Sequence, residues 1–398
     1  MQESGTGPYP DLISEASRKA WRWAVEHDFS GSDPYDALLS PFPFRLFGKW
    51  GEVAAIQLFK RSPFNLRPLF AVPTGHNPKA LGLFLETASR LQRGGDPDAA
   101  MQASRLFSLI TEKQSQGFSG ACWGYHFPWS GPAKRLPPGY PSTVVTAMVG
   151  RGLQAWYEVS QDDRVKAVLA QVPAFLMNDI AHTDDATGLC FSYTPAARDL
   201  CYNASLFAAE TLARCDAVAG EEELRGPVTR AVEFVLSRQK PDGGWLYSED
   251  PQSGRERVQI DFHQGFILDS LFHIRRLYRL NDPALDEAMW KGADFYLRKQ
   301  FTPEGRSLRR LPRQWPADIH AQAQGIITFS LLRELDPRFL PFAETLALWT
   351  IRNMMSEDGA FHYQKYPFFS IKTPFMRWGQ AWMVNALTCL SAGERSDI

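Results

Sequence analysis

Histidines and tyrosines, with an aspartate nearby, are the residues of this sequence best suited to moving a proton. His263 and His320 each stand at the start of an apolar stretch, and Asp261 closely precedes His263. Because histidine titrates near neutral pH, a histidine pair on opposite sides of a sugar ring could remove and return the proton next to a carboxylate. We therefore predict His263, His320, Tyr247, Tyr125 and Asp261 as catalytic residues of an epimerase or lyase.

A wider set of polar and aromatic residues falls at equivalent points, in the turns before apolar stretches or at their first positions. Guanidinium, amide and imidazole groups can neutralise a carboxylate, and aromatic rings can stack on sugar faces. Arg377 and Asn203 are expected to orient the acid group. The predicted substrate-binding residues are His76, Asn77, Trp123, His126, Asn203, Gln264, Gln324, His362, Tyr363, Arg377 and Trp378.

The loops that carry these residues are rich in arginine and lysine, although the net charge of the whole chain is −1. Arg306, Arg309 and Arg310 lie in one such loop. A pocket with a basic rim attracts an anionic ligand. The predicted partner is therefore an anionic, uronate-type oligo- or polysaccharide, and the balanced net charge gives no general attraction to nucleic acid.

Three other functions stay open at the level of the sequence. A glycoside hydrolase needs two carboxylates, one of them protonated, and Asp261 with Asp318 would be the pair. A non-catalytic glycan-binding protein could use the same basic and aromatic residues without turnover. A terpene cyclase or prenyltransferase-like protein is the last alternative, although the DxDD acid motif is absent and the nearest string is His182-Thr183-Asp184-Asp185.

Helices of two kinds alternate along the chain and must position these residues. The first kind has one apolar stripe, as in Leu224, Val228, Val232 and Val235, which is typical of a helix exposed on one side. The second kind is apolar or small almost all round, which predicts burial on every side. The first kind is predicted over 11–27, 96–113, 162–180, 221–239, 282–300 and 340–355. The second kind is predicted to begin near Asn77, Thr143, Asn203, His263, His320 and Gln380.

Short turns with an aromatic-x-Tyr pattern join the two kinds of helix. They include Trp123-Gly124-Tyr125 and Trp245-Leu246-Tyr247, with a degenerate copy near Gly305. Six outer helices that alternate with six inner ones predict an all-α fold, an (α/α)6 toroid formed by residues 1–398 as one domain. Residues 31–72 do not fit the period, and we expect an irregular extension packed on the rim or the first hairpin.

Two family resemblances follow from particular strings. The run RAVEFVLSRQKPDGGW, residues 230–245, resembles the QW repeat of squalene cyclases, with Gln239, Gly243 and Trp245 at the expected spacing. Over its whole length the chain resembles the six-hairpin glycosidase-like toroids. The strings KRSPFNLRP, NPKALGLFL, CWGYHFPW and DFHQGF resemble uncharacterised toroids of bacterial surface-polysaccharide gene clusters. This resemblance implies carbohydrate chemistry, in polysaccharide biosynthesis or modification.

Composition indicates the class of protein and its compartment. Five widely spaced cysteines, none in a CxxC motif, suit a reducing compartment rather than a disulfide framework. The N-terminal residues contain no apolar segment of a secretion signal, and no apolar run is long enough to span a membrane. We expect a cytoplasmic protein. No complete metal-ligand spacing occurs, so the expectation is that it has no metal and no cofactor.

Overall fold

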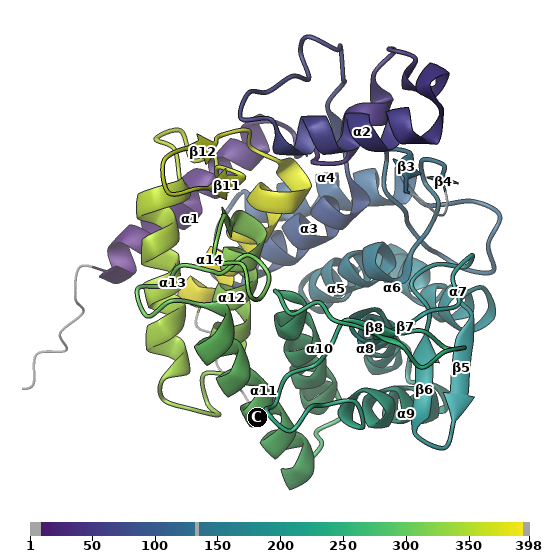
Figure 1. The fold of residues 1–398 in the computed structure, drawn as a ribbon. Helices are drawn as coiled ribbons and strands as arrows, with labels where there is room; N and C mark the ends of the chain where they lie inside the picture. Colours follow the sequence, from purple (N-terminus) through teal and green to yellow (C-terminus); the bar gives the residue numbers. More distant parts are fainter. Residues whose placement is uncertain (1–8, 132–134, 393–398) are drawn as a thin grey trace, which may run out of the picture.

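Six inner helices form a closed ring in the computed structural model, which describes residues 9–131 and 135–392 (Figure 1). Each inner helix packs against the next one along the chain, and the last packs back on the first. The predicted all-α (α/α)6 toroid is confirmed. The inner helices are α3 (Pro78–Arg93), α5 (Thr143–Ser160), α8 (Tyr202–Ala219), α10 (His263–Leu277), α12 (Ile319–Leu331) and α14 (Ala381–Ala392).

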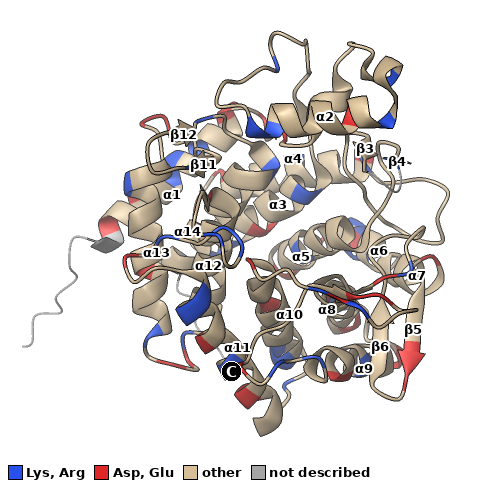
Figure 2. Cartoon of the chain, in the orientation of Figure 1, with Lys and Arg blue, Asp and Glu red and all other residues tan. Residues whose placement is uncertain are grey.

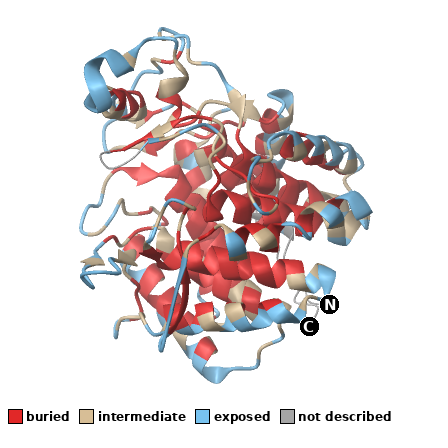
Figure 3. Cartoon of the chain, turned by 90° about the vertical axis from the view of Figure 1, so that its right-hand side faces the viewer, coloured by how far each residue is buried: buried red, intermediate tan, exposed pale blue. Residues whose placement is uncertain are grey.

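The outer helices each cover one inner helix. The first outer helix pairs with the last inner helix, so the beginning and the end of the ring form one hairpin. Figure 3 shows the consequence, with buried residues in the middle of the molecule and exposed residues at its periphery. The outer helices are α1 (Tyr9–Glu26), α4 (Ala99–Glu112), the pair α6 (Asp163–Leu169) and α7 (Val172–Asn178), α9 (Arg225–Leu236), α11 (Pro283–Gln300) and α13 (Phe339–Met354).

One outer helix is broken where the sequence predicted continuity. The expected helix over 162–180 is the pair α6 and α7, because Pro173 lies in the first turn of α7. Proline lacks the N–H that would continue the ladder, and its ring clashes with the carbonyl four residues earlier. The expected helix over 221–239 likewise begins with a 3-10 turn, Glu222–Leu224, before α9.

Two glycines allow the first two inner helices to touch through their backbones. A Cβ atom on Gly82 of α3 would lie 2.3 Å from the carbonyl oxygen of Met148 in α5. A Cβ atom on Gly152 of α5 would lie 2.4 Å from the carbonyl oxygen of Gly82. No side chain fits in this crossing, and glycine permits the close approach of two backbones.

Each aromatic turn is held to the inner helix that follows it. The backbone N–H of the first residue of the turn donates to a side chain at the start of that helix, or, for Gln380, in the π-helical turn directly before it, which satisfies a buried donor. The degenerate copy near Gly305 follows the same rule through Ser307. The donor and acceptor pairs are Trp123 with Thr146, Phe191 with Ser205, Trp245 with Gln264, Ser307 with Gln322, and Phe361 with Gln380.

Very short strands join the loops at the end of the ring where the inner helices begin. In one sheet β7 (Leu200–Cys201), β8 (Ser248–Glu249) and β9 (Glu256–Arg257) connect the loops before α8 and α10. In another, β10 (Ala317–Asp318), β11 (Gln364–Lys365) and β12 (Ser370–Ile371) connect those before α12 and α14. Two hairpins complete this end, β3 (Trp129–Ser130) with β4 (Arg135–Leu136) and β5 (His182–Asp185) with β6 (Gly188–Phe191).

The extension leaves and rejoins the ring through a strand pair, β1 (Ser30–Gly31) with β2 (Gly75–His76). It contains two 3-10 turns, Asp36–Leu39 and Phe44–Phe47, and a helix, α2 (Gly48–Arg61), which the sequence did not predict. A small core of Ala37, Ala55, Ile56 and Phe59 holds it together, separate from the core of the ring. Helix α2 also touches β3, and it projects beyond the ring at the top of Figure 1.

Candidate active site

Asp261 and His263 form a dyad at the start of α10. His263 Nδ1 lies 2.5 Å from Asp261 Oδ1, and the His263 backbone N–H donates to the same oxygen at 3.2 Å. Gln259 donates to the other carboxylate oxygen at 2.9 Å. Burial alone would raise the pKa of Asp261, but the charge of His263 and these hydrogen bonds outweigh it and lower the pKa to about 2. Asp261 is therefore an ionised partner that fixes the His263 ring.

His320, in the first turn of α12, is a buried histidine with one free ring nitrogen. Its Nδ1 lies 3.2 Å from the carbonyl oxygen of Trp378, which can only accept a hydrogen bond, so Nδ1 carries the proton. Its Nε2 is buried and has no hydrogen-bond partner among the described residues. Burial, with the charges of Lys79 and Arg377, lowers the pKa of His320 well below its ordinary value. His320 is therefore held neutral, with an unprotonated, buried Nε2.

One phenyl ring contacts both histidines. The Phe262 centroid lies 4.4 Å from that of His263, nearly parallel to it, and 4.5 Å from that of His320, at a steep angle. Tyr247 meets the His263 ring edge-on, at 4.8 Å between centroids. Trp378 and Trp382 flank His320, each at 4.7 Å. The helix starts therefore bring the two predicted proton carriers into contact with the same aromatic side chain.

Lys79, in the first turn of α3, faces the same place. The residue is 4% exposed, and its Nζ lies 5.5 Å from the Phe266 centroid and 5.3 Å from that of Trp382. Among the described residues it has no hydrogen-bond acceptor and no ion-pair partner. Burial, followed by the charges of Arg377 and Arg151, lowers the pKa of Lys79 well below its ordinary value. A buried amine of this kind would take up a proton when an anionic group binds beside it.

Arg377 is not free to bind a substrate carboxylate. It donates to Asp33 at 2.5 and 2.8 Å, and both side chains are almost fully buried. Burial lowers the pKa of Arg377, but the charge and hydrogen bonds of Asp33 more than offset this and raise it overall. The guanidinium also lies 4.9 Å from the Tyr125 ring centroid. Its charge is thus compensated within the protein, in place of the expected role in orienting an acid group.

Tyr125 and Tyr247, both predicted as catalytic, are each hydrogen-bonded to a neighbouring side chain. Tyr125 is hydrogen-bonded to Tyr193, and Tyr247 to Cys201. Burial, together with the charge of Tyr125, raises the pKa of Tyr193 well above its ordinary value, so this phenol stays protonated. Asn203 accepts a hydrogen bond from Cys201 Sγ at 3.3 Å.

Several predicted substrate-binding residues have structural partners instead. Trp123 is fully buried and donates from Nε1 to the Ile110 carbonyl at 2.8 Å. Gln264 is bonded at both its polar atoms to the Trp245 backbone, at 2.9 and 2.5 Å. Gln324 is buried deeper in the ring and donates to Asp269 at 2.6 Å. These three residues stabilise the toroid, and we do not include them among the substrate contacts.

The remaining predicted residues lie in three small groups around the ring. Asn77 caps α3 through the Lys79 N–H at 3.0 Å and donates to His126 Nδ1 at 3.2 Å. His76 Nε2 bonds to the Asp28 carbonyl oxygen at 2.8 Å, outside this group. His362 and Tyr363 precede β11, and the buried Tyr363 packs on Phe375 at 4.9 Å between centroids.

Asp318, the partner of Asp261 in the hydrolase alternative, is surrounded by donors. It accepts from Trp378 Nε1 at 2.8 Å, from Gln364 Nε2 at 2.7 Å and from the His320 backbone N–H at 3.1 Å. Arg309 approaches it at 3.4 Å. This carboxylate caps α12, and both members of the proposed acid pair are thereby engaged within the protein.

Arginines of the predicted basic rim are partly neutralised by these same carboxylates. Arg309 faces Asp318, and Arg310 Nε lies 3.6 Å from Asp261 Oδ2. Arg306 donates to the carbonyl of Gln314 at 2.7 Å. Figure 2 shows Lys and Arg interspersed with Asp and Glu along the loops. Among the described residues, the buried amine of Lys79 rather than one of these arginines is the group without an ion-pair partner at the centre of the site.

Two residues of the site carried no clear chemical signal in the sequence. Lys79 stands in the first turn of an apolar helix, where the helix dipole disfavours a cation, and that misplacement could have singled it out. Asp33 lies in the extension, far from Arg377 along the chain. Nothing in its local sequence indicates this pairing.

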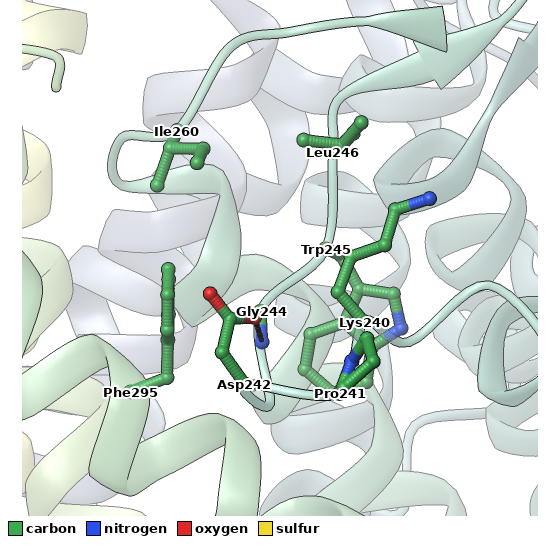
Figure 4. Close-up of a pocket in the computed structure, with 8 residues that line it drawn as sticks. All are labelled: Lys240, Pro241, Asp242, Gly244, Trp245, Leu246, Ile260 and Phe295. Atoms are coloured by element: carbon green, nitrogen blue, oxygen red, sulfur yellow. Dashed lines mark hydrogen bonds between the residues drawn. The ribbon is translucent and has the colours of Figure 1, made fainter.

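Two cavities border this end of the ring without including either histidine. One, of about 270 Å³, lies between the Asp242 turn, Ile260 and Phe295 of α11 (Figure 4). The other, of about 400 Å³, is lined by His182, Arg198 and Gln252 among others. No group of three or more His, Cys, Asp or Glu side chains placed to hold a metal ion occurs within residues 9–131 and 135–392.

Known proteins resemble this chain in structure and not in sequence. No protein-family model matches it, and no curated protein matches it. Cellobiose 2-epimerase from Bacillus thermoamylovorans B4167 superposes with a TM-score of 0.64 at 14% identity, over 80% of this chain and 88% of the other. An unsaturated glucuronyl hydrolase specific for heparin gives 0.66 at 13% identity, over 96% and 97%.

A glycoside hydrolase family 76 mannosidase, Bt3792 from Bacteroides thetaiotaomicron VPI-5482, gives a TM-score of 0.66 at 11% identity, over 97% of this chain and 100% of the other. These neighbours share the six-hairpin toroid. At such identities the likeness establishes the fold, and the reaction must be argued from the site. Neither the resemblance to the QW repeat nor the one to polysaccharide gene clusters has a counterpart in these comparisons.

Among the described residues, no helix combines the length and the apolar composition that crossing a membrane requires.

Proposed function

We propose that this protein is a carbohydrate-active enzyme that moves a proton on an anionic, uronate-type sugar, most simply as an epimerase. The observation that carries the proposal is the contact of both the Asp261–His263 dyad and His320 with the ring of Phe262. The two histidines have different partners, since Asp261 binds His263 Nδ1 while His320 Nε2 has no hydrogen-bond partner among the described residues. Superposition on a cellobiose 2-epimerase, a sugar epimerase from a ruminal bacterium and a glucuronyl hydrolase supports carbohydrate chemistry.

In the proposed step, neutral His320 takes the C5 proton of the sugar through Nε2. The electron pair of the broken C–H bond moves into the adjacent carboxylate and forms an enediolate. Lys79, protonated when the anion binds, stabilises the charge that develops there. Protonated His263, held by ionised Asp261, then returns a proton to C5 from the other face.

A lyase would begin with the same proton abstraction and end differently. The enediolate would expel the group at C4 instead of receiving a proton, and a tyrosine could protonate the departing oxygen. Tyr247 beside His263 is the candidate for this role. The hydrolase alternative has less support, because Asp261 has a pKa of about 2 and cannot act as the protonated acid.

The test is proton NMR of the purified protein with uronate-containing oligosaccharides in deuterated water. Deuterium at C5 without chain cleavage would establish epimerisation, whereas a new C4–C5 double bond would establish a lyase. New reducing ends without either signal would overturn proton transfer in favour of hydrolysis. Binding to the oligosaccharides with none of the three signals would indicate the non-catalytic alternative.

A further inference from the structure

The extension carries an unusual set of exposed apolar side chains. Large hydrophobic residues are normally scattered singly over a protein surface, and a cluster marks an interaction site. Within residues 42–69 five such side chains are more than three-fifths exposed. The exposed large hydrophobic residues of this segment are Phe42, Leu46, Phe47, Trp50, Leu58, Phe64 and Leu69.

Helix α2 presents apolar residues on two faces. Ala55, Ile56 and Phe59 point into the small core of the extension. Trp50 and Leu58 are 63% and 54% exposed and lie outside that buried stripe. Figure 3 shows this helix as an exposed element at the edge of the molecule with buried residues along one face. The inner face of α2 therefore packs in the core of the extension. The exposed apolar residues of α2 are not covered by any other part of the described chain.

Positive charge lies at both ends of this helix. Residues 41–72 contain five basic residues, Arg45, Lys49, Lys60, Arg61 and Arg67, and one acid, Glu52. Arg67 is buried and paired with Asp36, and the buried Glu52 pairs with Arg45 and Arg135. Lys49 and Arg61 are exposed, near the first and at the last residue of α2. Lys and Arg mark both ends of α2 in Figure 2. The chain as a whole has a net charge of −1, whereas residues 41–72 carry more basic than acidic residues.

We infer that residues 42–69 dock this protein on the surface of an anionic lipid bilayer. A helix with Trp, Phe and Leu outward and Lys or Arg beside them lies in the interface of such a bilayer, and the basic residues add attraction to anionic headgroups. Leu46 and Leu69, 81% and 79% exposed, protrude individually. A bilayer takes up protruding side chains without needing a complementary shape, whereas a protein partner must supply matching pockets. A second copy would bring two basic patches together, which is unfavourable.

The docked segment adjoins the proposed active site. Lys60 of α2 bonds to the Tyr35 hydroxyl and lies 5.3 Å from the ring centroid of Trp378, the residue that flanks His320. Membrane docking would therefore hold the Trp378 side of the site near the bilayer. The inference rests on the surface of the extension and not on the proposed reaction, so either can fail without the other.

Co-flotation of the full-length protein with vesicles tests the inference. We expect binding to vesicles of phosphatidylcholine with about a third phosphatidylglycerol, and weaker binding to pure phosphatidylcholine or at high salt. Trp50→Ser combined with Leu58→Ser should lower the partition coefficient at least tenfold, because it removes two membrane-facing side chains. Arg61→Gln should lower it about fivefold, as expected for one basic residue near an anionic surface.

The matched control is Phe368→Ser, which removes a 98% exposed aromatic side chain from another loop and should leave binding unchanged. Circular dichroism shows whether each variant is folded. Equal flotation of the wild type and the Trp50→Ser/Leu58→Ser variant would overturn the inference. So would an absence of flotation together with a dimer that the same variant converts to a monomer in sedimentation velocity, because the patch would then be a contact between two copies.

Discussion

Arg377 donates two hydrogen bonds to the Asp33 carboxylate, at 2.5 and 2.8 Å. This buried ion pair joins the turn before α14 to the extension. Removing one partner leaves the other charge buried and uncompensated. We expect Asp33→Ala to lower the free energy of unfolding by about 3–5 kcal/mol in denaturant titrations. Asp184→Ala removes the exposed pair with Arg230 and should cost about 0–1 kcal/mol. Equal losses in the two variants would contradict this account of Arg377.

Asp261→Asn tests the dyad. The amide cannot carry the negative charge that pairs with protonated His263, so the turnover number should fall about 10²–10⁴-fold, the usual contribution of general acid–base catalysis. KM should change little, because Asp261 is buried beneath His263 and would not touch the sugar. Asp250→Asn, on an exposed loop, is the matched control. A large effect on KM with an unchanged turnover number would assign Asp261 to binding instead.

Lys79→Met should separate stability from activity. The pKa of Lys79 is lower in the folded protein than the value of about 10.4 in the unfolded chain. Between these two pKa values the unfolded chain holds a proton on Lys79 that the folded protein does not. The free energy of unfolding therefore rises with pH, by about 1.4 kcal/mol per pH unit. Methionine has no titrating group, so the variant should be more stable than the wild type at neutral pH. Its free energy of unfolding should also rise less than that of the wild type between pH values of about 7 and 9. Substrate turnover should be lost. A less stable variant with the wild-type slope would show that Lys79 is compensated by a partner.

The burial of His126 should make the folded protein less stable as the pH falls below about 6.5. Burial, only partly opposed by the charge of Asp33, lowers the pKa of His126 to about 4. An unfolded histidine titrates near 6.5, so as pH falls from about 6.5 to 4 the unfolded chain gains the proton first and stability falls by about 1.4 kcal/mol per unit. His126→Gln should flatten this part of the curve of unfolding free energy against pH. Parallel curves for the two proteins would contradict the shift.

The ring could be predicted from the sequence because helix periodicity is a local property. Inner and outer helices differ in how far apolar residues encircle them, and that difference is visible within each segment, as in α9 and α12. The break at Pro173 was equally local, and it was missed because the flanking residues keep the apolar stripe. Helix α2 was missed because the exposed Trp50 and Leu58 lie outside the apolar stripe of Ala55, Ile56 and Phe59 and obscure its period.

The site was predicted less completely, because its geometry depends on pairings between distant segments. His263 and His320 stand at helix starts, and the prediction that these starts gather is consistent with their shared contact to Phe262. The pairing of Arg377 with Asp33 joins residues 344 positions apart, and no local pattern reveals it. A polar residue at the start of a helix can either hold a backbone turn or face the site, and the sequence does not distinguish these two roles. Gln264 and His263 are neighbours, yet one holds a backbone turn and the other faces the site.

Gln264→Ala tests that distinction. Its side chain bonds to both the N–H and the carbonyl oxygen of Trp245, so the variant leaves two buried backbone groups unsatisfied, at a cost of about 1–3 kcal/mol each. Gln322 holds the turn at Ser307 in the equivalent way, through the Ser307 N–H at 2.5 Å and the Gly305 carbonyl at 3.0 Å, so Gln322→Ala is the matched comparison. If both glutamines are structural, both variants should lose similar unfolding free energy, and KM measured on the folded protein should stay close to that of the wild type. If Gln264 instead binds the sugar, KM will rise in Gln264→Ala and not in Gln322→Ala, and our exclusion of Gln264 from the substrate contacts will be wrong.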